Sequence, residues 1–184
     1  TAWLDVMASD PIEPFTDWQA DIAGQRHGLG PTVEDEPGRV YPTEVLDAMF
    51  NKVGVTPFVT TDVGQNQMWT CQRVVVDSPR KFLSSGGAGT MGYGLPSAIG
   101  AALANPGEKV ICVVGDGGFQ MSMGELITLN RLRLPVKVML LDNGVLGMVR
   151  QWQELYFGSR YSGTVLNDNP DFVALAKVLG IGAV

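Results

Sequence analysis

Residues 110–118 read VICVVGDGG, and this stretch decides the fold. Its first part, residues 110–114, is apolar without a break, which is typical of a strand buried on both faces of a parallel sheet. Asp116, Gly117 and Gly118 follow at the point where such a strand would end. Ligands bind at the carboxyl ends of parallel strands, so the stretch predicts both a sheet and the place of a site.

The same alternation continues on both sides of this stretch. Residues 136–141 (VKVMLL) are expected to form a second strand and residues 58–61 (FVTT) a short one, and the segments between them have helical periodicity. We expect helices at about residues 43–53, 64–72, 99–104 and 119–132, and two more that begin near residues 147 and 171. A Gly-rich loop is expected over residues 84–94, without a clean strand before it. The pattern predicts an α/β fold, with three α/β/α layers around a mostly parallel sheet.

Residues 1–40 lack this pattern. They contain many Pro and Gly residues and an acidic run, with a helical turn or two expected near residues 15–22. We expect them to be a linker from a preceding domain that the sequence does not include, because the chain opens on Thr1 and reads as a piece of something longer. Residues 41–184 form the predicted domain, whose C-terminal boundary could lie beyond residue 184.

Composition excludes several classes of protein. Of the 184 residues, 45% are hydrophobic, which is enough for a packed core. The net charge of -6 argues against a nucleic-acid partner. No apolar stretch approaches the roughly 20 residues that span a bilayer, so no membrane association is expected. With Cys71, Cys112 and His27 as the only cysteines and histidine, a disulfide framework, a zinc cluster or a histidine-dependent nucleophile is not expected.

Two predicted strand ends carry oxygen ligands for a metal ion. Asp116 follows the strand expected at residues 110–114 and Asn143 the strand expected at residues 136–141, 27 positions later, about the length of a strand–helix–strand unit. If the strands are neighbours, a carboxylate and an amide meet at one sheet edge, which suits Mg²⁺. The glycines after Asp116 and the helix start behind them favour a phosphate group beside that ion. Each motif taken singly could also be a simple turn.

The Gly-rich loop has two interpretations. Residues 87–92, GAGTMG, match the G-x-G-x-x-G pattern of dinucleotide-binding proteins, but no clean strand precedes them and no suitable acid follows. We therefore favour a loop that packs around a flat heterocycle, with Met91 as an apolar support. Met121, Met123, Met139 and Met148 are expected in the core, although Met148 follows a turn and could instead reach a cofactor.

The motifs together resemble a known family. GDG at residues 115–117 followed by DN at 142–143 resembles the thiamine-diphosphate motif. The stretches TTDVGQ (60–65), SGGAGTMGYGLP (85–96) and LGMVRQW (146–152) resemble the large subunit of acetohydroxyacid synthase, also called acetolactate synthase. The resemblance runs from about residue 41 to residue 181 and covers only the C-terminal, diphosphate-binding domain of that family.

The resemblance implies a set of site residues. Mg²⁺ would be held by Asp116, Asn143 and the carbonyl of Val145. Thiamine diphosphate would be bound by Val63, Gly64, Gln65, Asn66, Gly89, Met91, Gly115, Gly117, Gly118 and Met148. Met148, Val149 and Trp152 would line the substrate channel, although Trp152 could instead be a buried helix aromatic. Asn66 replaces a histidine that is common in the family, and Asp142 an asparagine.

The resemblance also implies what the parent protein does. It would decarboxylate pyruvate and join the product to a second 2-keto acid, in branched-chain amino-acid biosynthesis. No catalytic residue is expected in this chain, because the activating glutamate belongs to an absent domain, and the chain alone is expected to be inactive. FAD would bind to the full-length parent and not to this chain. The parent is expected to be a cytoplasmic homo-oligomer, and a regulatory small subunit is left open.

Three alternatives remain open at this point. Another thiamine-diphosphate-dependent decarboxylase or oxidase would share the metal motif but should lack the stretch at residues 148–152. A nicotinamide-dependent dehydrogenase would need the loop at Gly87 to follow a strand directly. A non-catalytic interaction module would bind without turnover.

Overall fold

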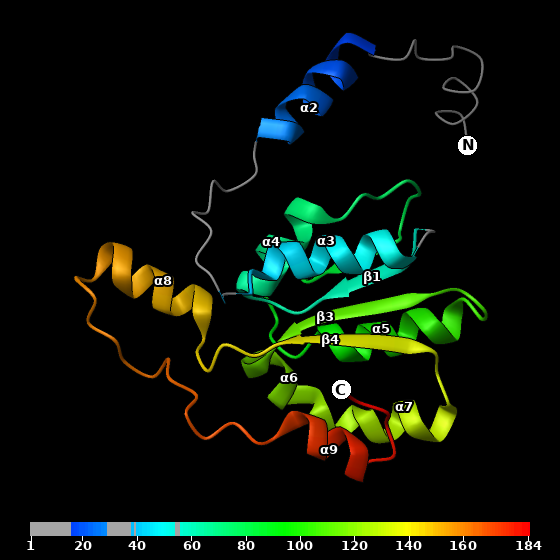
Figure 1. The fold of residues 1–184 in the computed structure, drawn as a ribbon, viewed down its shortest axis with the longest axis vertical. Coiled ribbons are helices and arrows are strands. Elements are labelled where there is room, and N and C mark those ends of the chain that lie inside the picture. Colours follow the sequence, from blue (N-terminus) through cyan, green and yellow to red (C-terminus); the bar gives the residue numbers. More distant parts are fainter. Residues whose placement is uncertain (1–15, 29–37, 39, 54–55) are drawn as a thin grey trace. The chain divides into compact units, whose positions relative to one another are not determined.

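The computed structural model describes residues 16–28, 38, 40–53 and 56–184, in two units, Thr1–Arg39 and Val40–Val184 (Figure 1). The first unit contains the helix α2 (Thr16–Gly28), which is longer than the turn or two expected there. The rest of the expected linker lies outside the described residues, except Gly38 and Val40. That residues 1–40 form a linker therefore stays a prediction.

The second unit alternates strands and helices along the chain. Its elements are α3 (Pro42–Val53), β1 (Phe58–Thr61), α4 (Gln65–Arg73), β2 (Phe82–Ser84), α5 (Gly94–Ala104), β3 (Val110–Gly115), α6 (Asp116–Ser122), the 3₁₀ helix η1 (Met123–Glu125), α7 (Leu126–Leu132), β4 (Val136–Leu141), α8 (Gly147–Tyr156) and α9 (Phe172–Val178). Within the described residues, none of the helices is both long and apolar enough to cross a membrane.

The four strands form one parallel sheet in the order β2-β1-β3-β4. Phe58 pairs with Val110, Val110 with Val136, and Gly115 at the end of β3 with Leu141 at the end of β4. The two strands whose ends were expected to meet at one edge of the sheet, β3 and β4, are therefore direct neighbours. This sheet confirms the predicted α/β class.

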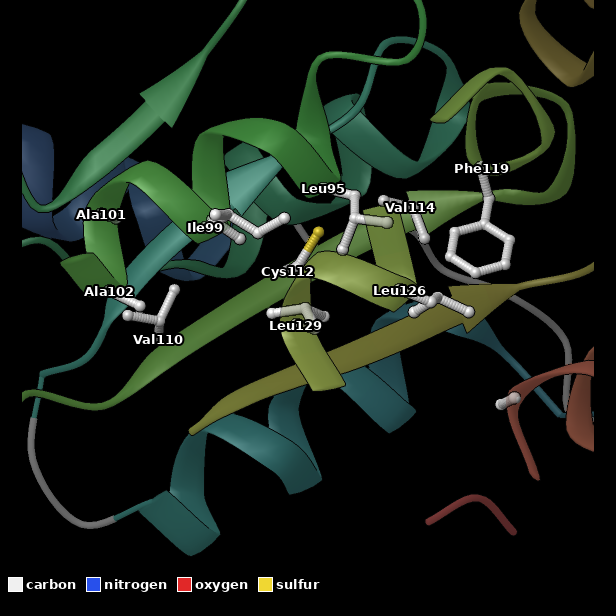
Figure 2. Packing of buried hydrophobic residues seen from close by; sticks show 12 residues of the cluster. Leu95, Ile99, Ala101, Ala102, Val110, Cys112, Val114, Phe119, Leu126 and Leu129 are labelled. Atoms are coloured by element: carbon white, nitrogen blue, oxygen red, sulfur yellow. The ribbon is translucent and has the colours of Figure 1, made fainter. Parts of the chain in front are cut away.

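Helices cover both faces of the sheet. Residues along β3 show this, since they alternate between two hydrophobic clusters. Cys112 and Val114 pack with residues of α5, α6, α7 and α9 on one face (Figure 2). Ile111 and Val113 pack on the other face with Leu46 of α3, and partly buried residues of α3 and α4 complete that cluster. β3 is apolar throughout because neither of its faces meets water, and the predicted three layers are present (Figure 1).

Two expectations about elements and one about a core residue were wrong. A strand, β2, does precede the Gly-rich loop; it has only three residues and pairs on one side, so it leaves little periodicity in the sequence. The helix expected over residues 119–132 begins at Asp116 and is interrupted by η1. Met121 is 62% exposed rather than in the core, whereas Met123 and Met139 pack against the two clusters as expected.

Candidate cofactor and metal site

A pocket lies at the carboxyl ends of the strands, where the strand order reverses. From β1 the chain moves outward to β2, then returns to β3 on the other side of β1 and continues to β4. The connections after β1 and β3 therefore lead to opposite sides and leave a crevice above the sheet. Open α/β sheets bind ligands in such a crevice. The pocket holds about 550 Å³, including the part open to solvent. Its lining comes from the segments after β1, β3 and β4, from the Gly-rich loop and from the start of α8.

Most of the predicted site residues line this pocket. Those that do are Val63, Gly64, Gln65, Asn66, Met91, Gly115, Asp116, Gly117, Gly118, Asn143, Val145, Met148 and Val149. Gly89 lies in the exposed part of the Gly-rich loop and is not among them. Trp152 is not either: it is 60% exposed on α8, with its ring edge-on to Tyr156 at 6.1 Å, so the alternative of a buried aromatic is wrong.

Sequence reasoning missed four residues of the lining, Trp69, Leu141, Leu146 and Gly147. A helix residue such as Trp69 carries no motif that marks it, and its place follows from the packing of α4. Gly147 could have been found, since it opens the predicted helix directly after the second ligand motif. A Cβ at this position would collide with Oε1 of Gln65 and lie 3.1 Å from Nδ2 of Asn143.

Asp116 and Asp142 leave adjacent strands side by side, one residue after the paired Gly115 and Leu141. The backbone N–H of Gly144 donates to Oδ2 of Asp116 at 3.0 Å and to Oδ1 of Asp142 at 3.3 Å. Asp116 is only 2% exposed, whereas Asp142 is exposed. Burial raises the pKa of the Asp116 carboxyl, and the nearby charge of Asp142 acts in the same direction.

The other two predicted metal ligands lie in the loop after β4. Oδ1 of Asn143 accepts a hydrogen bond from the backbone N–H of Val145 at 3.1 Å. Val145 in turn forms an antiparallel bridge with Val165. A carboxylate, an amide and a backbone carbonyl make an oxygen donor set of low charge, which fits Mg²⁺. No group of three or more His, Cys, Asp or Glu side chains in the described part of the chain could hold a metal ion, so a cation here would depend on this mixed set.

The wall of the pocket near Asp116 is backbone rather than side chain. A Cβ on Gly117 would lie 2.5 Å from Cδ2 of Leu146 and 3.6 Å from Cε of Met91. A Cβ on Gly115 would lie 3.3 Å from Oδ1 of Asn66. Because these positions carry no Cβ, the side chains of Leu146, Met91 and Asn66 pack directly against the backbone at the start of α6. The donor set and the pocket of about 550 Å³ fit a metal-bound diphosphate.

Two polar residues of α4 connect the pocket to its surroundings. Asn66 is 4% exposed, and its Nδ2 donates to the backbone carbonyls of Asp62 at 3.2 Å and Val113 at 3.3 Å. Nε2 of Gln65 donates to Oε1 of Gln151 on α8 at 3.4 Å. The amide hydrogens of Asn66 are therefore bonded to the ends of β1 and β3.

Asp62 is a fully buried carboxylate that sequence reasoning passed over. Its oxygens accept hydrogen bonds from the backbone N–H groups of Val63 at 2.8 Å, Gly92 at 3.0 Å and Gly94 at 2.9 Å. Two of these donors lie 30 and 32 residues away, so no local pattern could reveal the contact. Asp62 holds the Gly-rich loop that carries Met91 against the end of β1.

The same contacts bear on the dinucleotide interpretation of the loop. β2 does come directly before the loop, which is what that interpretation required. However, the N–H groups of Gly92 and Gly94 are bonded to the Asp62 carboxylate. Two N–H groups at the end of the loop are therefore already paired within the protein and unavailable to a phosphate.

Comparison with known proteins agrees with this geometry. The family described as "Thiamine pyrophosphate enzyme, C-terminal TPP binding domain" matches residues 62–184. The chain is 46% identical over 171 residues to the acetolactate synthase isozyme 2 large subunit of Escherichia coli, which covers 93% of this chain and 31% of that protein. It is 40% identical over 184 residues to a probable acetolactate synthase large subunit of Methanococcus aeolicus, covering 97% of this chain and 31% of the relative.

A third relative is an acetolactate synthase of Arthrospira platensis, 53% identical over 127 residues, with 68% of this chain and 22% of the relative covered. The chain thus spans about a third or less of the length of these relatives. The family match covers the loops after β1, β3 and β4 and excludes the nicotinamide alternative. The chain therefore belongs to the thiamine pyrophosphate enzymes, as a C-terminal TPP-binding domain.

Proposed function

We propose that this chain is the cofactor- and Mg²⁺-binding domain of an acetolactate synthase large subunit. The observation that carries the proposal is the convergence of the loops after β1, β3 and β4 on one pocket, with oxygen donors and Cβ-free backbone on the same side. The names of the relatives, all acetolactate synthases at 40–53% identity, favour this enzyme over other thiamine-diphosphate-dependent decarboxylases or oxidases.

Each part of the pocket would have its own task. Asp116, Asn143 and the carbonyl of Val145 would hold Mg²⁺, and the amides at Gly117 and Gly118 would bind the diphosphate. Met91 would support the rings of the cofactor, and Gly89, which lies outside the pocket lining, would be the acceptor that the resemblance implies. Val63, Gly64, Gln65, Asn66, Gly115 and Met148 would complete the cofactor contacts. Val149 and Trp152, with Met148, would face the substrate channel.

When bound, thiamine diphosphate supplies a carbanion and stabilises the charge that decarboxylation of a 2-keto acid releases. The residues of this chain would anchor and orient the cofactor, and the apolar side chains of Met91, Leu146 and Met148 would keep water from its rings. The activating glutamate would come from another domain, so the chain alone would bind without turnover.

The complete protein would convert pyruvate and a second 2-keto acid in branched-chain amino-acid biosynthesis. It would carry FAD on a domain outside this sequence and assemble as a homo-oligomer. The name "large subunit", which most of the relatives bear, favours a small regulatory subunit as a further partner. Residues 41–184 would form the cofactor domain, joined through residues 1–40 to the domain before it.

Calorimetric titration of the chain with thiamine diphosphate, with and without Mg²⁺, tests the proposal. We expect binding that requires Mg²⁺. Asp116→Ala should weaken binding by at least the roughly 1.5–3 kcal/mol of a charged hydrogen bond, because it removes the one buried carboxylate of the donor set. Asp168→Ala, which removes an exposed carboxylate, is the matched control and should bind like the wild type. Equal affinity of wild type and Asp116→Ala would refute the proposed metal site.

A further inference from the structure

Residues 164–169, here called the strap, run beside the loop that carries the predicted metal ligands. The backbone N–H of Leu146 donates to the carbonyl of Thr164, and that of Leu166 to the carbonyl of Gly144, both at 2.8 Å. Val145 and Val165 form the bridge between these two bonds. The strap therefore fixes the backbone on both sides of Val145, although it lies about twenty residues further along the chain.

Asn169, at the end of the strap, contacts both carboxylates. Its Nδ2 donates to Oδ2 of Asp116 at 2.8 Å and to Oδ1 of Asp142 at 2.9 Å. Its Oδ1 accepts from Nε2 of Gln120 on α6 at 2.8 Å. This last bond fixes the orientation of the amide, because the donor of Gln120 requires an oxygen on that side and so turns the NH₂ group toward the carboxylates.

A neutral donor suits this position for an electrostatic reason. Two adjacent carboxylates repel each other, and Asn169 shares with the N–H of Gly144 the task of holding them together. A lysine or arginine could also bridge them, but its positive charge would oppose a cation at the same site. An amide holds the carboxylates while leaving their negative charge for the cation.

We propose that Asn169 is a positioning residue for the metal site, acting through Asp116 and Asp142, which it orients without contacting the cofactor. The proposal rests on the proposed function, since it assumes that Asp116 binds a divalent cation. It extends the site to the strap, a segment that carries none of the predicted ligands.

The test measures Mn²⁺ binding in the presence of thiamine diphosphate by electron paramagnetic resonance. For Asn169→Ala we expect a dissociation constant for Mn²⁺ about 10- to 100-fold higher, the usual effect of removing a residue that orients a metal ligand. Asn167→Ala is the matched control: it removes the same amide from the same strap, at an exposed position. It should bind Mn²⁺ like the wild type.

A second variant guards against general loss of structure. Gln120→Ala keeps Asn169 but frees its amide to rotate, so it should weaken Mn²⁺ binding in the same direction and by less. Urea unfolding of the metal-free proteins is measured in parallel. Wild-type affinity in Asn169→Ala, or weakening no greater than in Asn167→Ala, would overturn the proposal. If the wild type itself binds no Mn²⁺ with the cofactor, the proposed function fails, and the role of Asn169 fails with it.

Discussion

At the scale of single residues, glycine at position 118 is dictated by a buried charge. The Cβ of any larger residue there would collide with Oδ1 of Asp62 and lie 2.5 Å from its Cγ. The carboxylate cannot move away, because three backbone N–H groups are bonded to it. The position is thus set by packing as much as by any ligand.

We therefore expect Gly118→Ala to lower the free energy of unfolding by about 3 kcal/mol, the upper range for overpacking a rigid interior. Gly124→Ala is the matched control, because Gly124 lies close by along the chain and a Cβ there meets nothing within 4 Å. That variant should be neutral or slightly stabilising, since alanine favours helical backbone over glycine. Urea denaturation of both variants measures the difference, and equal stability would contradict the assigned rigidity of Asp62.

Some individual residues could be predicted from the sequence and others could not. Asp116 and Asn143 were found because each follows an apolar strand at a spacing that one strand–helix–strand unit explains. Asp62 and Asn169 were missed because their importance depends on contacts with segments roughly 30 to 50 residues away. Whether the predicted residues bind the cofactor stays a prediction that the titration above must test.

At the scale of elements, the two cysteines occupy opposite environments. Cys112 is buried in the central strand β3, where burial raises the pKa of its thiol to about 12. Cys71 is exposed on α4, and partial burial raises its pKa as well. Only thiolate reacts with alkylating agents, so both location and pKa protect Cys112.

Iodoacetamide at mildly alkaline pH should accordingly label Cys71 slowly and leave Cys112 unmodified in the native protein. In urea both cysteines should be labelled, because unfolding removes the burial that raises the pKa values. Peptide mass spectrometry identifies the modified residue. Labelling of native Cys112 at a rate similar to that of Cys71 would show that β3 opens far more readily than its packing implies.

The helix α8 presents its aromatic residues to solvent. Trp152 contacts Tyr156 of the same helix and is not part of either hydrophobic cluster. Trp152→Leu should change the free energy of unfolding by no more than about 0.5 kcal/mol, as exposed substitutions do. Its affinity for thiamine diphosphate with Mg²⁺ should match that of the wild type, because Trp152 lies outside the pocket lining. A large loss of cofactor binding, measured by the same titration, would contradict its assignment to the substrate channel.

Elements with a strong local sequence pattern were predictable, and elements without one were not. β3 was evident from an uninterrupted apolar run, β4 from a run in which only Lys137 is polar, and α9 from Asp171, whose side chain accepts the N–H of Ala174 as a helix cap. β2 was missed because an edge strand of three residues depends on its partner for its conformation. The break at η1 was missed because the helical periodicity continues across it.

At the scale of the whole molecule, the exposed apolar surface predicts association. Val149, Trp152, Leu155, Tyr156 and Phe157, on and just after α8, are 49–72% exposed. Monomeric proteins rarely leave such groups of large apolar side chains in water. We expect light scattering to give at least twice the mass of one chain at high concentration. A Leu155→Glu, Tyr156→Glu variant should lower that mass, and a clean monomer for the wild type would contradict the expectation.

The contact between Asp62 and Gly118 also limits how this sequence can change over time. Asp62 fills the space that a side chain at position 118 would need, so the two positions are epistatic. A Cβ at position 118 collides with the carboxylate of Asp62, and a smaller residue at position 62 leaves the N–H groups of Val63, Gly92 and Gly94 without their acceptor, so each change alone is destabilising. A larger residue in this part of the pocket therefore requires coupled changes at two positions that lie far apart in the sequence.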